Sequence, residues 1–491
     1  MATSTVAAGG SSFLASRRGK LTLLLLCLVA FLDYVDASIV NVALPSIHDD
    51  LHVSVQNVQW VISGYLLTYG GFMLLGGRAA DLLGRRRLLV AGTVVFALAS
   101  LGAGLANESG VLVAARLVQG LGAAMMLPAA LSLVTTSFSS GTDRTKALGA
   151  WGAMAGVASA AGVLLGGVLT QGPGWRWVFF VNPLACVGIL AGTLLLIDRD
   201  RPRAGVARFD LLGALLSTAG MLLLVYGIVR APIVGWGATS TVCCLIAAAI
   251  ILAGFVVNER RVDRPLLPLS VFRIDGLAAA DATQLIAIAG FLSTFFFLTL
   301  YMQDVLGYSP IRTGLSYLPV TGGVIVAAGV CSKLFPRTGT RPVLVIGALA
   351  AAGGVGYLSR LPLHGTYPTD LLPGLIVMSL GLGAVFVGAT TAANAGVPAD
   401  QAGLAAALIN ASQQLGGALG IAIFTAIATS HTNRLLATHI AQPSALASGF
   451  HRALIAAAVF LVAAALIAVR ATNTRGEPTT LEPVPVAPLA A

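Results

Sequence analysis

Charged residues are scarce in this chain. Asp, Glu, Lys and Arg together make up 10% of its 491 residues, whereas a soluble domain carries about 25%. Hydrophobic residues make up 57% of the sequence. This balance excludes a soluble globular protein, a disordered chain and a coiled coil. It predicts an all-α integral membrane protein, because the apolar stretches are continuous and reach the length of about 20 residues that a membrane-spanning helix needs.

Lysine is nearly absent. The chain contains only Lys20, Lys146 and Lys333, and its other Lys and Arg positions are all arginine. None of the three follows a phosphate-cradling glycine loop of the type GxxxxGK[ST], so the sequence gives no sign of an ATPase. The five cysteines are lone or adjacent in the chain, and they indicate neither a disulfide framework nor a zinc site. We therefore expect no metal and no cofactor.

Charges and turn residues divide the sequence into fourteen apolar segments, each of the length of a membrane-spanning helix. We expect these spans near residues 21–44, 59–77, 88–106, 111–135, 147–169, 177–197, 211–229, 239–257, 277–302, 313–334, 342–361, 371–393, 404–428 and 453–469. An even number of spans places both termini on the same side of the membrane.

The distribution of basic residues predicts which side that is. With the N-terminus inside, the predicted inner segments hold 22 of the 29 Lys and Arg residues and the outer segments hold six. Because basic residues concentrate in cytoplasmic loops, this bias predicts cytoplasmic termini. The net charge of +10 then fits loops that face anionic lipid, and we expect no nucleic-acid partner.

The two halves of the chain carry a faint repeat. GRR at residues 84–86 and GTR at 339–341 each lie after the second span of a six-span set, and a further glycine follows each at equal spacing. Two similar six-span units are typical of transporters built by duplication. The predicted parts are a tail (1–20), an N-terminal six-helix bundle (21–200), two inserted spans with linkers (201–275), a C-terminal six-helix bundle (276–470) and a second tail (471–491).

Two carboxylates, Asp33 and Asp36, lie inside the first span, one helical turn apart. An ionised carboxylate in the bilayer costs several kcal/mol unless it is paired or hydrated. Its alternative is to hold a proton, because burial disfavours the charged form. Each is therefore a candidate proton or cation site, and a static counter-ion that fixes helix packing is the alternative.

Arg116, within the fourth span, is the expected partner. Asp36 lies about 12 Å below the outer end of its span, and Arg116 lies about 7.5 Å below the same surface, at about 1.5 Å per residue. This difference in depth is within reach of an arginine side chain. If the two helices are neighbours, Arg116 meets Asp36 before it meets the deeper Asp33.

The loop GRAADLLGRRR at residues 77–87 is the most specific local pattern. Arg85 and Arg86 alone would indicate only a cytoplasmic anchor. In addition, Gly77 allows another helix to approach closely, and Asp81 precedes the turn at Gly84, where it could meet the N-terminus of that helix. Such a contact can break and reform, which suits a gate.

Other polar and aromatic side chains are candidates for substrate contact, although ordinary packing and interhelical hydrogen bonds explain them about as well. They are Asn41, Tyr65, Tyr69, Asn410 and Gln413.

The loop at residues 77–87 closely resembles the cytoplasmic loop motif of the major facilitator superfamily. Further stretches are similar to its fourteen-span drug:proton antiporter branch, the QacA/EmrB type of multidrug efflux transporter. They read DASIVNVALP (36–45), RLVQG (116–120), WRWVFFVN (175–182), RPLLPLSVFR (264–273), YMQDVLGYSP (301–310) and NASQQLGGALG (410–420). Together these motifs are specific, and the resemblance covers about residues 20–470.

The resemblance implies the major facilitator fold, with two six-helix bundles plus two inserted spans. It also implies alternating access and export of small, drug-like molecules that are amphipathic and often cationic or aromatic, driven by inward proton flow. In the family's pattern Asp36 matches the first-span carboxylate and Arg116 matches the fourth-span arginine, a proton-coupling pair. Asp33 is additional to that pattern and is expected to bind substrate charge or a second proton.

The fifth span carries a glycine pattern with one departure from the family. The antiporter motif of this branch usually has proline before its paired glycines, whereas Val163 stands there in this chain. The glycines form a small-residue face that allows close helix packing, and packing alone explains them at least as well as a role in coupling. They are Gly152, Gly156, Gly162, Gly166 and Gly167.

Other functions remain as alternatives. A dedicated exporter of one endogenous metabolite, antibiotic or lipid would carry the same motifs. An ion channel would need a pore-lining repeat of charge, which we do not find, and a membrane enzyme would need a polar catalytic cluster. We therefore expect a transporter and no enzyme, working as a monomer in the cell membrane of a bacterium.

Overall fold

The computed structural model describes residues 13–138, 141–200, 210–262, 265–266, 274, 276–395 and 402–474. Within these residues all regular elements are helices. Thirteen of them are long and apolar enough to cross a membrane, and the described apolar part of one more, Ala160–Gln171, is shorter. The expectation of an all-α membrane protein is confirmed.

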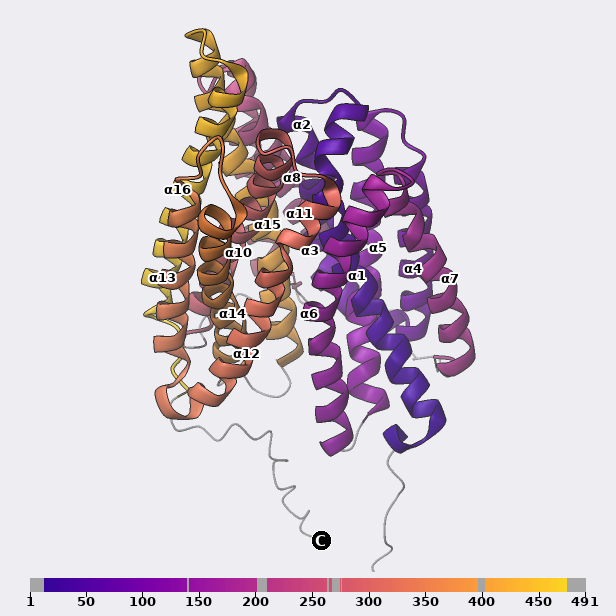
Figure 1. The fold of residues 1–491 in the computed structure, drawn as a ribbon. Helices are drawn as coiled ribbons and strands as arrows, with labels where there is room; N and C mark the ends of the chain where they lie inside the picture. The colour runs from indigo at the N-terminus through magenta and orange to yellow at the C-terminus, as the bar shows by residue number, and fades with distance from the viewer. Residues whose placement is uncertain are drawn as a thin grey trace, which may run out of the picture.

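Six long helices of the first half form an N-terminal bundle, coloured indigo to magenta in Figure 1. They are α1 (Arg17–Asp50), α3 (Trp60–Leu83), α4 (Arg85–Gly104), α5 (Ser109–Ser137), α6 (Gly141–Gln171) and α7 (Trp177–Leu196), with the short η1 (Phe13–Ala15) and α2 (Val55–Val58) beside them. Ser16 starts α1, because its side chain accepts a hydrogen bond from the Gly19 amide.

The second half forms a C-terminal bundle, coloured orange to yellow in Figure 1. Its helices are α10 (Leu277–Leu300), α11 (Pro310–Ser316), α12 (Leu318–Thr338), α13 (Thr340–Leu358), α14 (Leu372–Asn394), α15 (Ala402–Ala437) and α16 (Gln442–Ala468), with the π-helical turns η3 (Tyr301–Val305) and η4 (Tyr367–Leu371). The predicted tenth span is divided at Tyr317 between α11 and α12. Pro319 supplies a reason, because proline lacks an amide donor and disfavours helical backbone before it.

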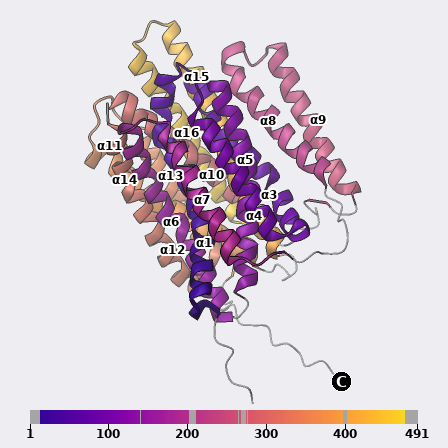
Figure 2. The ribbon, with the colours of Figure 1, turned by 90° about the vertical axis from the view of Figure 1, so that its right-hand side faces the viewer.

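Two helices stand outside the bundles. Figure 2 shows α8 (Leu211–Val234) and α9 (Thr239–Arg261) as a hairpin at one side of the molecule. The hairpin contacts α3 and α15, and Gly71 of α3 lies directly against the side chain of Thr218 on α8. The fold is thus two six-helix bundles plus two inserted spans, as the sequence predicts. The exact domain boundaries stay a prediction.

The repeat between the halves is visible in the backbone. Gly84 and Gly339 both have positive φ, at 107° and 82°, and both begin a helix, α4 and α13 respectively. Glycine adopts such angles without strain. The next glycine of each repeat, Gly92 or Gly347, then packs against the following long helix, α5 or α14. The equivalent glycines therefore have equivalent structural roles in the two bundles.

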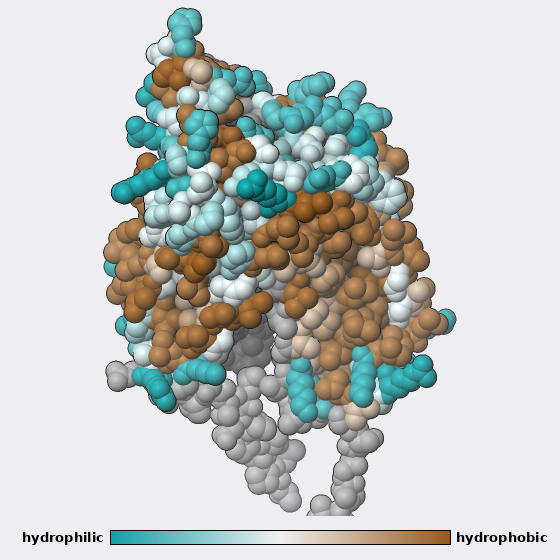
Figure 3. Space-filling model, viewed as in Figure 1, coloured by the Kyte–Doolittle hydropathy of each residue, from teal (hydrophilic) through white to brown (hydrophobic). Residues whose placement is uncertain are grey.

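Apolar side chains form a belt around the molecule. Figure 3 shows this belt across the middle of one face, with hydrophilic side chains above and below it. Several leucines of the molecule expose more than 60% of their surface: Leu98, Leu184, Leu195 and Leu466. Such exposure is costly in water and favourable in a lipid bilayer.

Both termini of the helical core, Arg17 and Ala468, lie at the same end of the molecule, which we call the terminal end (Figure 1). The two bundles contact each other closely at the opposite end, which we call the far end. There a Cβ added to Gly167 of α6 would lie 2.8 Å from the Ile311 Cα of α11. In addition, the Gln303 side chain donates a 2.9 Å hydrogen bond to the Val42 carbonyl of α1.

Candidate functional site

Asp36 lies in the interior of the N-terminal bundle with no exposed surface. Its Oδ2 accepts a 2.7 Å hydrogen bond from Arg116 Nη1 of α5. Its Oδ1 accepts hydrogen bonds from Gln119 Nε2 at 2.9 Å and from Asn182 Nδ2 of α7 at 2.6 Å. All three partners donate, so both carboxylate oxygens of Asp36 are hydrogen-bonded.

Arg116 is held by the same network. Its Nε donates to the Val61 carbonyl of α3 at 2.8 Å, and its Nη1 also reaches Gln119 Oε1 at 2.7 Å. Only 1% of the arginine is exposed. The pair therefore joins α1, α3, α5 and α7 in one polar centre, and Arg116 meets Asp36 as the helix depths predict. Loss of either partner would leave a buried charge unpaired.

Asp33 lies one turn away on α1 and has different partners. Tyr65 donates a 2.8 Å hydrogen bond to its Oδ1, and Tyr69 donates a 3.1 Å hydrogen bond to its Oδ2. Asp33 is 3% exposed, and both tyrosines come from α3. The two predicted substrate contacts Tyr65 and Tyr69 are thus hydrogen-bonded to the carboxylate that the sequence singled out.

Tyr65 connects the two carboxylate sites. The Arg116 guanidinium carbon lies 4.2 Å from the centre of the Tyr65 ring, within the range of a cation–π contact. The hydroxyl of the same ring bonds Asp33. A shift of Arg116 would therefore move the Tyr65 ring, and with it the hydroxyl that is hydrogen-bonded to Asp33.

The glycine face of α6 lies behind the carboxylates. A Cβ on Gly162 would lie 3.0 Å from the Val35 carbonyl, and one on Gly166 would lie 2.8 Å from the Ile39 carbonyl. These two glycines let α6 press against the segment of α1 that carries Asp36. Gly167 instead faces α11 across the bundle interface.

The surroundings of Gly152 and Gly156 lie outside what the structure describes. Val163, which replaces the family's proline, is buried, and its carbonyl would lie 2.7 Å from a Cβ on Gly314 of α11.

The loop at residues 77–87 is tied to α7 and to the segment that follows it. Asp200 accepts hydrogen bonds from the Arg86 and Arg87 amides at 3.2 and 2.9 Å, so it caps the N-terminus of α4. Gly84 leaves room for this carboxylate. The Arg86 side chain donates to the Leu194 carbonyl at 3.0 Å, near the C-terminal end of α7.

Part of the expectation for this loop is wrong. The close helix approach occurs at Gly76, which lies against the Ala124 carbonyl of α5, whereas Gly77 has only an ordinary 3.8 Å contact with Pro128. Helix rotation decides which of two adjacent glycines faces the neighbour. The side chain of Asp81 lies outside the described part of the molecule, and Arg85 is partly buried.

The remaining predicted substrate contacts are spread over two helices. Asn41 is buried on α1 and donates to the Ala37 carbonyl at 2.9 Å, within its own helix. Asn410 and Gln413 are partly exposed on α15. That helix meets α3 near Gly70, where a Cβ would lie 2.9 Å from Gln414 Cβ.

Sequence reasoning missed three polar partners of the centre. Gln119 lies one turn after Arg116 on the same helix face, and this spacing was the available signal. Asn182 was present in the quoted motif at residues 175–182 without an assigned role. Its amide also donates to Ser100 Oγ at 3.0 Å, and Ser100 donates to the Phe179 carbonyl at 2.9 Å.

A further buried carboxylate, Asp281 of α10, was also missed. It is 4% exposed, and neither carboxylate oxygen has a hydrogen-bond partner among the described residues. Gln284, one turn further along, is fully buried, and within the described part of the chain its side-chain nitrogen and oxygen also have no partner. Buried polar groups in proteins are normally hydrogen-bonded, so this pair contrasts with the fully bonded Asp36.

Comparison with known proteins gives a consistent result. A family model described as the Major Facilitator Superfamily matches residues 26–421. The chain is 40% identical to the puromycin resistance protein pur8 of Streptomyces alboniger, over 88% of this chain and 86% of that protein.

Two further relatives are named for other antibiotics. The cephamycin export protein CmcT of Amycolatopsis lactamdurans is 38% identical, over 91% of each chain. The tetracenomycin C resistance and export protein of Streptomyces glaucescens is 36% identical, over 83% of this chain and 76% of that one.

A solved structure shares the fold. It is that of a bacterial homologue of the human lysosomal transporter Spinster, in an inward-facing and unoccupied conformation. The TM-score is 0.65 at 16% sequence identity, over 93% of this chain and 97% of the other.

Proposed function

Because this chain belongs to the major facilitator superfamily, we propose that it is a proton-coupled antiporter that exports amphipathic, often cationic or aromatic small molecules by alternating access. The observation that carries the proposal is the fully buried Asp36, held by Arg116, Gln119 and Asn182. An ionisable pair at this depth is a functional site by default, because the bilayer makes it costly to keep.

In the proposed cycle Asp36 takes up and releases the coupling proton. A proton on Asp36 removes the negative charge that faces Arg116 and weakens their 2.7 Å hydrogen bond. Arg116 keeps its bond to the Val61 carbonyl and can turn toward Gln119. Since α6 packs through Gly162 and Gly166 against the same part of α1, we infer that a shift of α1 reaches the far-end contact with α11.

Asp33 is the proposed contact for a positively charged substrate. Its two hydrogen bonds come from neutral tyrosine hydroxyls, and its side chain has no salt bridge among the described residues. A carboxylate whose charge is not matched by a cation attracts a cationic ligand strongly in a low-dielectric site. Tyr65 and Tyr69 would then offer ring faces to an aromatic substrate.

We further propose that the terminal end faces the cytoplasm, so that both termini lie inside. The excess of Lys and Arg in the loops at that end supports this orientation. The close contacts of Gly167 and Gln303 at the far end then correspond to a state that is closed to the outside. The loop at residues 77–87 would act as the inner gate, and the transporter would work as a monomer.

A dedicated exporter of one antibiotic is the second candidate. The relatives named above support it, because each is named for a single antibiotic or for its export. The polar centre does not separate a narrow substrate range from a broad one.

The proposed function is tested by expressing the protein in a bacterium that lacks its own drug pumps. The panel contains puromycin, lincomycin, tetracenomycin C and a cephamycin, together with cationic dyes and neutral compounds of similar size. We expect resistance to at least one member, and loss of efflux when the proton gradient is collapsed. Efflux that survives the collapse of the gradient would contradict proton coupling, and resistance to one compound only would favour the dedicated exporter.

A further inference from the structure

The basic residues at the far end fall into two groups. Arg176 bonds Asp50 at 2.7 Å, Arg230 bonds the Tyr226 hydroxyl at 2.6 Å, and Arg312 lies 3.8 Å from the centre of the Tyr308 ring. Arg360, Arg434 and Arg452 have no such partner among the residues that the structure describes.

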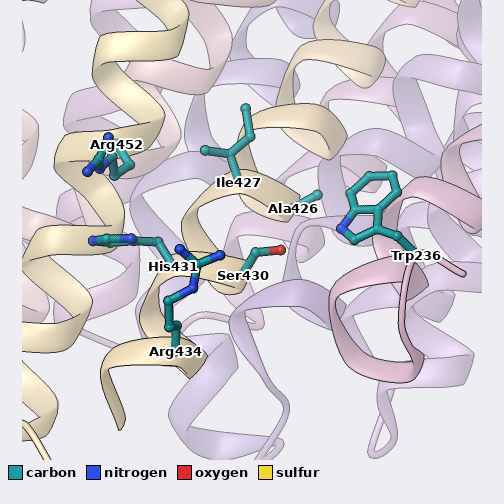
Figure 4. Close-up of a pocket in the computed structure, with 7 residues that line it drawn as sticks. All are labelled: Trp236, Ala426, Ile427, Ser430, His431, Arg434 and Arg452. Carbon is teal, nitrogen blue, oxygen red and sulfur yellow. The ribbon is translucent and has the colours of Figure 1, made fainter. Parts of the chain in front are cut away.

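Two of these three unpartnered arginines line the same cavity. Figure 4 shows His431 and Arg434 of α15 side by side, with Arg452 of α16 next to them and Trp236 of the hairpin loop on the opposite side. The cavity has a volume of about 380 Å³, and Ser430, Ala426 and Ile427 complete its lining. It therefore lies between the inserted hairpin and the C-terminal bundle.

Among the described residues, the lining carries positive charge and no carboxylate. Arg434 and Arg452 are both exposed, so an anion can reach both guanidinium groups from outside the protein. An arginine pair is also the arrangement that binds phosphate best, because each guanidinium presents planar, directed donors. The two arginines of the lining are therefore suited to contact a phosphate group.

The position of the cavity indicates where that anion comes from. Trp236 lies in the turn between α8 and α9, is 53% exposed, and marks the level at which tryptophan borders lipid headgroups. Below it, Ile246 and Ile250 of α9 expose 54% and 65% of their surface, as expected of a helix that faces acyl chains. Ala426 and Ile427 add apolar side chains to the lining of the cavity.

We propose that this cavity binds the phosphate of an anionic phospholipid from the leaflet at the far end. Arg434 and Arg452 contact the phosphate, Ser430 donates a further hydrogen bond, and Trp236 packs on the glycerol region. The lipid then joins the hairpin to the C-terminal bundle, with the hairpin contributing Trp236 and the bundle contributing the charges. This role is independent of proton coupling.

The test uses the purified full-length protein in detergent and measures its melting temperature with added lipid. Phosphatidylglycerol is compared with phosphatidylcholine of the same acyl chains and with inorganic phosphate. We expect phosphatidylglycerol to raise the melting temperature at concentrations about tenfold lower than phosphatidylcholine, which corresponds to about 1.4 kcal/mol of binding free energy. Inorganic phosphate should have little effect at these concentrations.

Variants assign the effect to this cavity. The double variant R434Q/R452Q should need about tenfold more phosphatidylglycerol for the same shift. The matched control is Arg360→Gln, which removes an unpartnered arginine of the far end from outside the cavity and should behave like the wild type. R434K/R452K keeps the charge and should retain most of the response, which separates loss of charge from damage to the fold.

Several outcomes would overturn the proposal. Equal responses to phosphatidylglycerol and phosphatidylcholine would exclude recognition of the lipid's charge. An equal response to inorganic phosphate would assign the cavity to a soluble anion. A wild-type response of R434Q/R452Q, or an equal loss in Arg360→Gln, would place the lipid elsewhere on the protein.

Discussion

Asp33 and Asp36 lie one helical turn apart on α1, and their carboxylates have entirely different partners. Asp36 accepts hydrogen bonds from Arg116 and two amide side chains, whereas Asp33 accepts hydrogen bonds only from tyrosine hydroxyls. Two carboxylates on one helix face are thereby given different chemical environments. The first two predictions separate their roles.

The first prediction concerns Asp36→Asn. The asparagine cannot take up or release a proton, so gradient-driven dye efflux from energised cells should be abolished while the protein still reaches the membrane. The substitution leaves the Arg116 charge without its counter-ion, which in buried pairs costs about 3–5 kcal/mol of stability. The double variant D36N/R116Q removes both charges and should recover part of that stability without recovering transport. Wild-type efflux by Asp36→Asn would rule out the coupling role.

The second prediction concerns Asp33→Asn. It should lower resistance to monocationic and dicationic compounds more than resistance to neutral compounds of similar size, because only the charge of the site is lost. Tyr69→Phe removes one 3.1 Å hydrogen bond to the carboxylate and should have a smaller effect in the same direction. Resistance profiles are normalised to the amount of protein in the membrane. Equal losses for charged and neutral compounds would show that Asp33 only stabilises the fold.

The third prediction concerns the loop at residues 77–87. Asp81→Asn and Arg85→Ala should slow transport more than they weaken substrate binding, because the loop is far from any site near the membrane centre. Asp200→Ala removes the cap of α4 and should also lower the free energy of unfolding by about 0.5–2 kcal/mol. Binding affinity and turnover are measured on the same purified variants. A collapse of binding with unchanged turnover of the bound substrate would contradict a gate.

The fourth prediction concerns the far-end contact. Gly167→Val places a side chain where a Cβ would already lie 2.8 Å from Ile311 Cα, so the bundles should fail to close there and transport should fall. Gly188→Val is the matched control, because no atom lies within 4 Å of a Cβ at that position. A cysteine introduced at the buried Val42 should react faster with an impermeant thiol reagent in Gly167→Val than in the control. Equal reactivity in the two variants would show that this contact does not hold the far end closed.

The fifth prediction concerns Asp281. Because its buried carboxyl group has no hydrogen-bond partner in the part of the chain that the structure describes, Asp281→Leu should raise the free energy of unfolding by about 1–3 kcal/mol. Asp33→Leu, which loses two hydrogen bonds from tyrosine, should lower it. Thermal melting of both purified variants in the same detergent tests the contrast. A lower melting temperature of Asp281→Leu would show that this carboxyl group stabilises the protein.

The amino-acid sequence was sufficient for the fold class and for the Asp36–Arg116 pair. A bilayer leaves no solvent partner for backbone amides and carbonyls, so long apolar stretches have to be helices. The rise per residue then fixes the depth of every side chain in its span. Depth alone was enough to match Asp36 with Arg116, and their 2.7 Å contact agrees with it.

Other features depended on how each helix is rotated and which helices are neighbours. Hydropathy specifies that a residue lies in a span, but a uniformly apolar helix gives little indication of the face that it turns to its neighbour. Thus the close approach lies at Gly76 instead of Gly77, Tyr65 and Tyr69 turn toward Asp33, and Asn182 reaches Asp36 from a helix 146 residues away.

The unpartnered Asp281 and the cluster of Arg434 and Arg452 are also products of the tertiary structure. In the sequence Asp281 is one polar residue at the start of a span, and the two arginines lie in the predicted outer segment between the last two spans. The tertiary packing leaves Asp281 without a donor among the described residues, and it places both arginines in the lining of one cavity with Trp236 on the opposite side. The sequence thus determined the depth of each side chain, because helix rise is a local property. The tertiary structure decided its partners, because these require the positions of several helices at once.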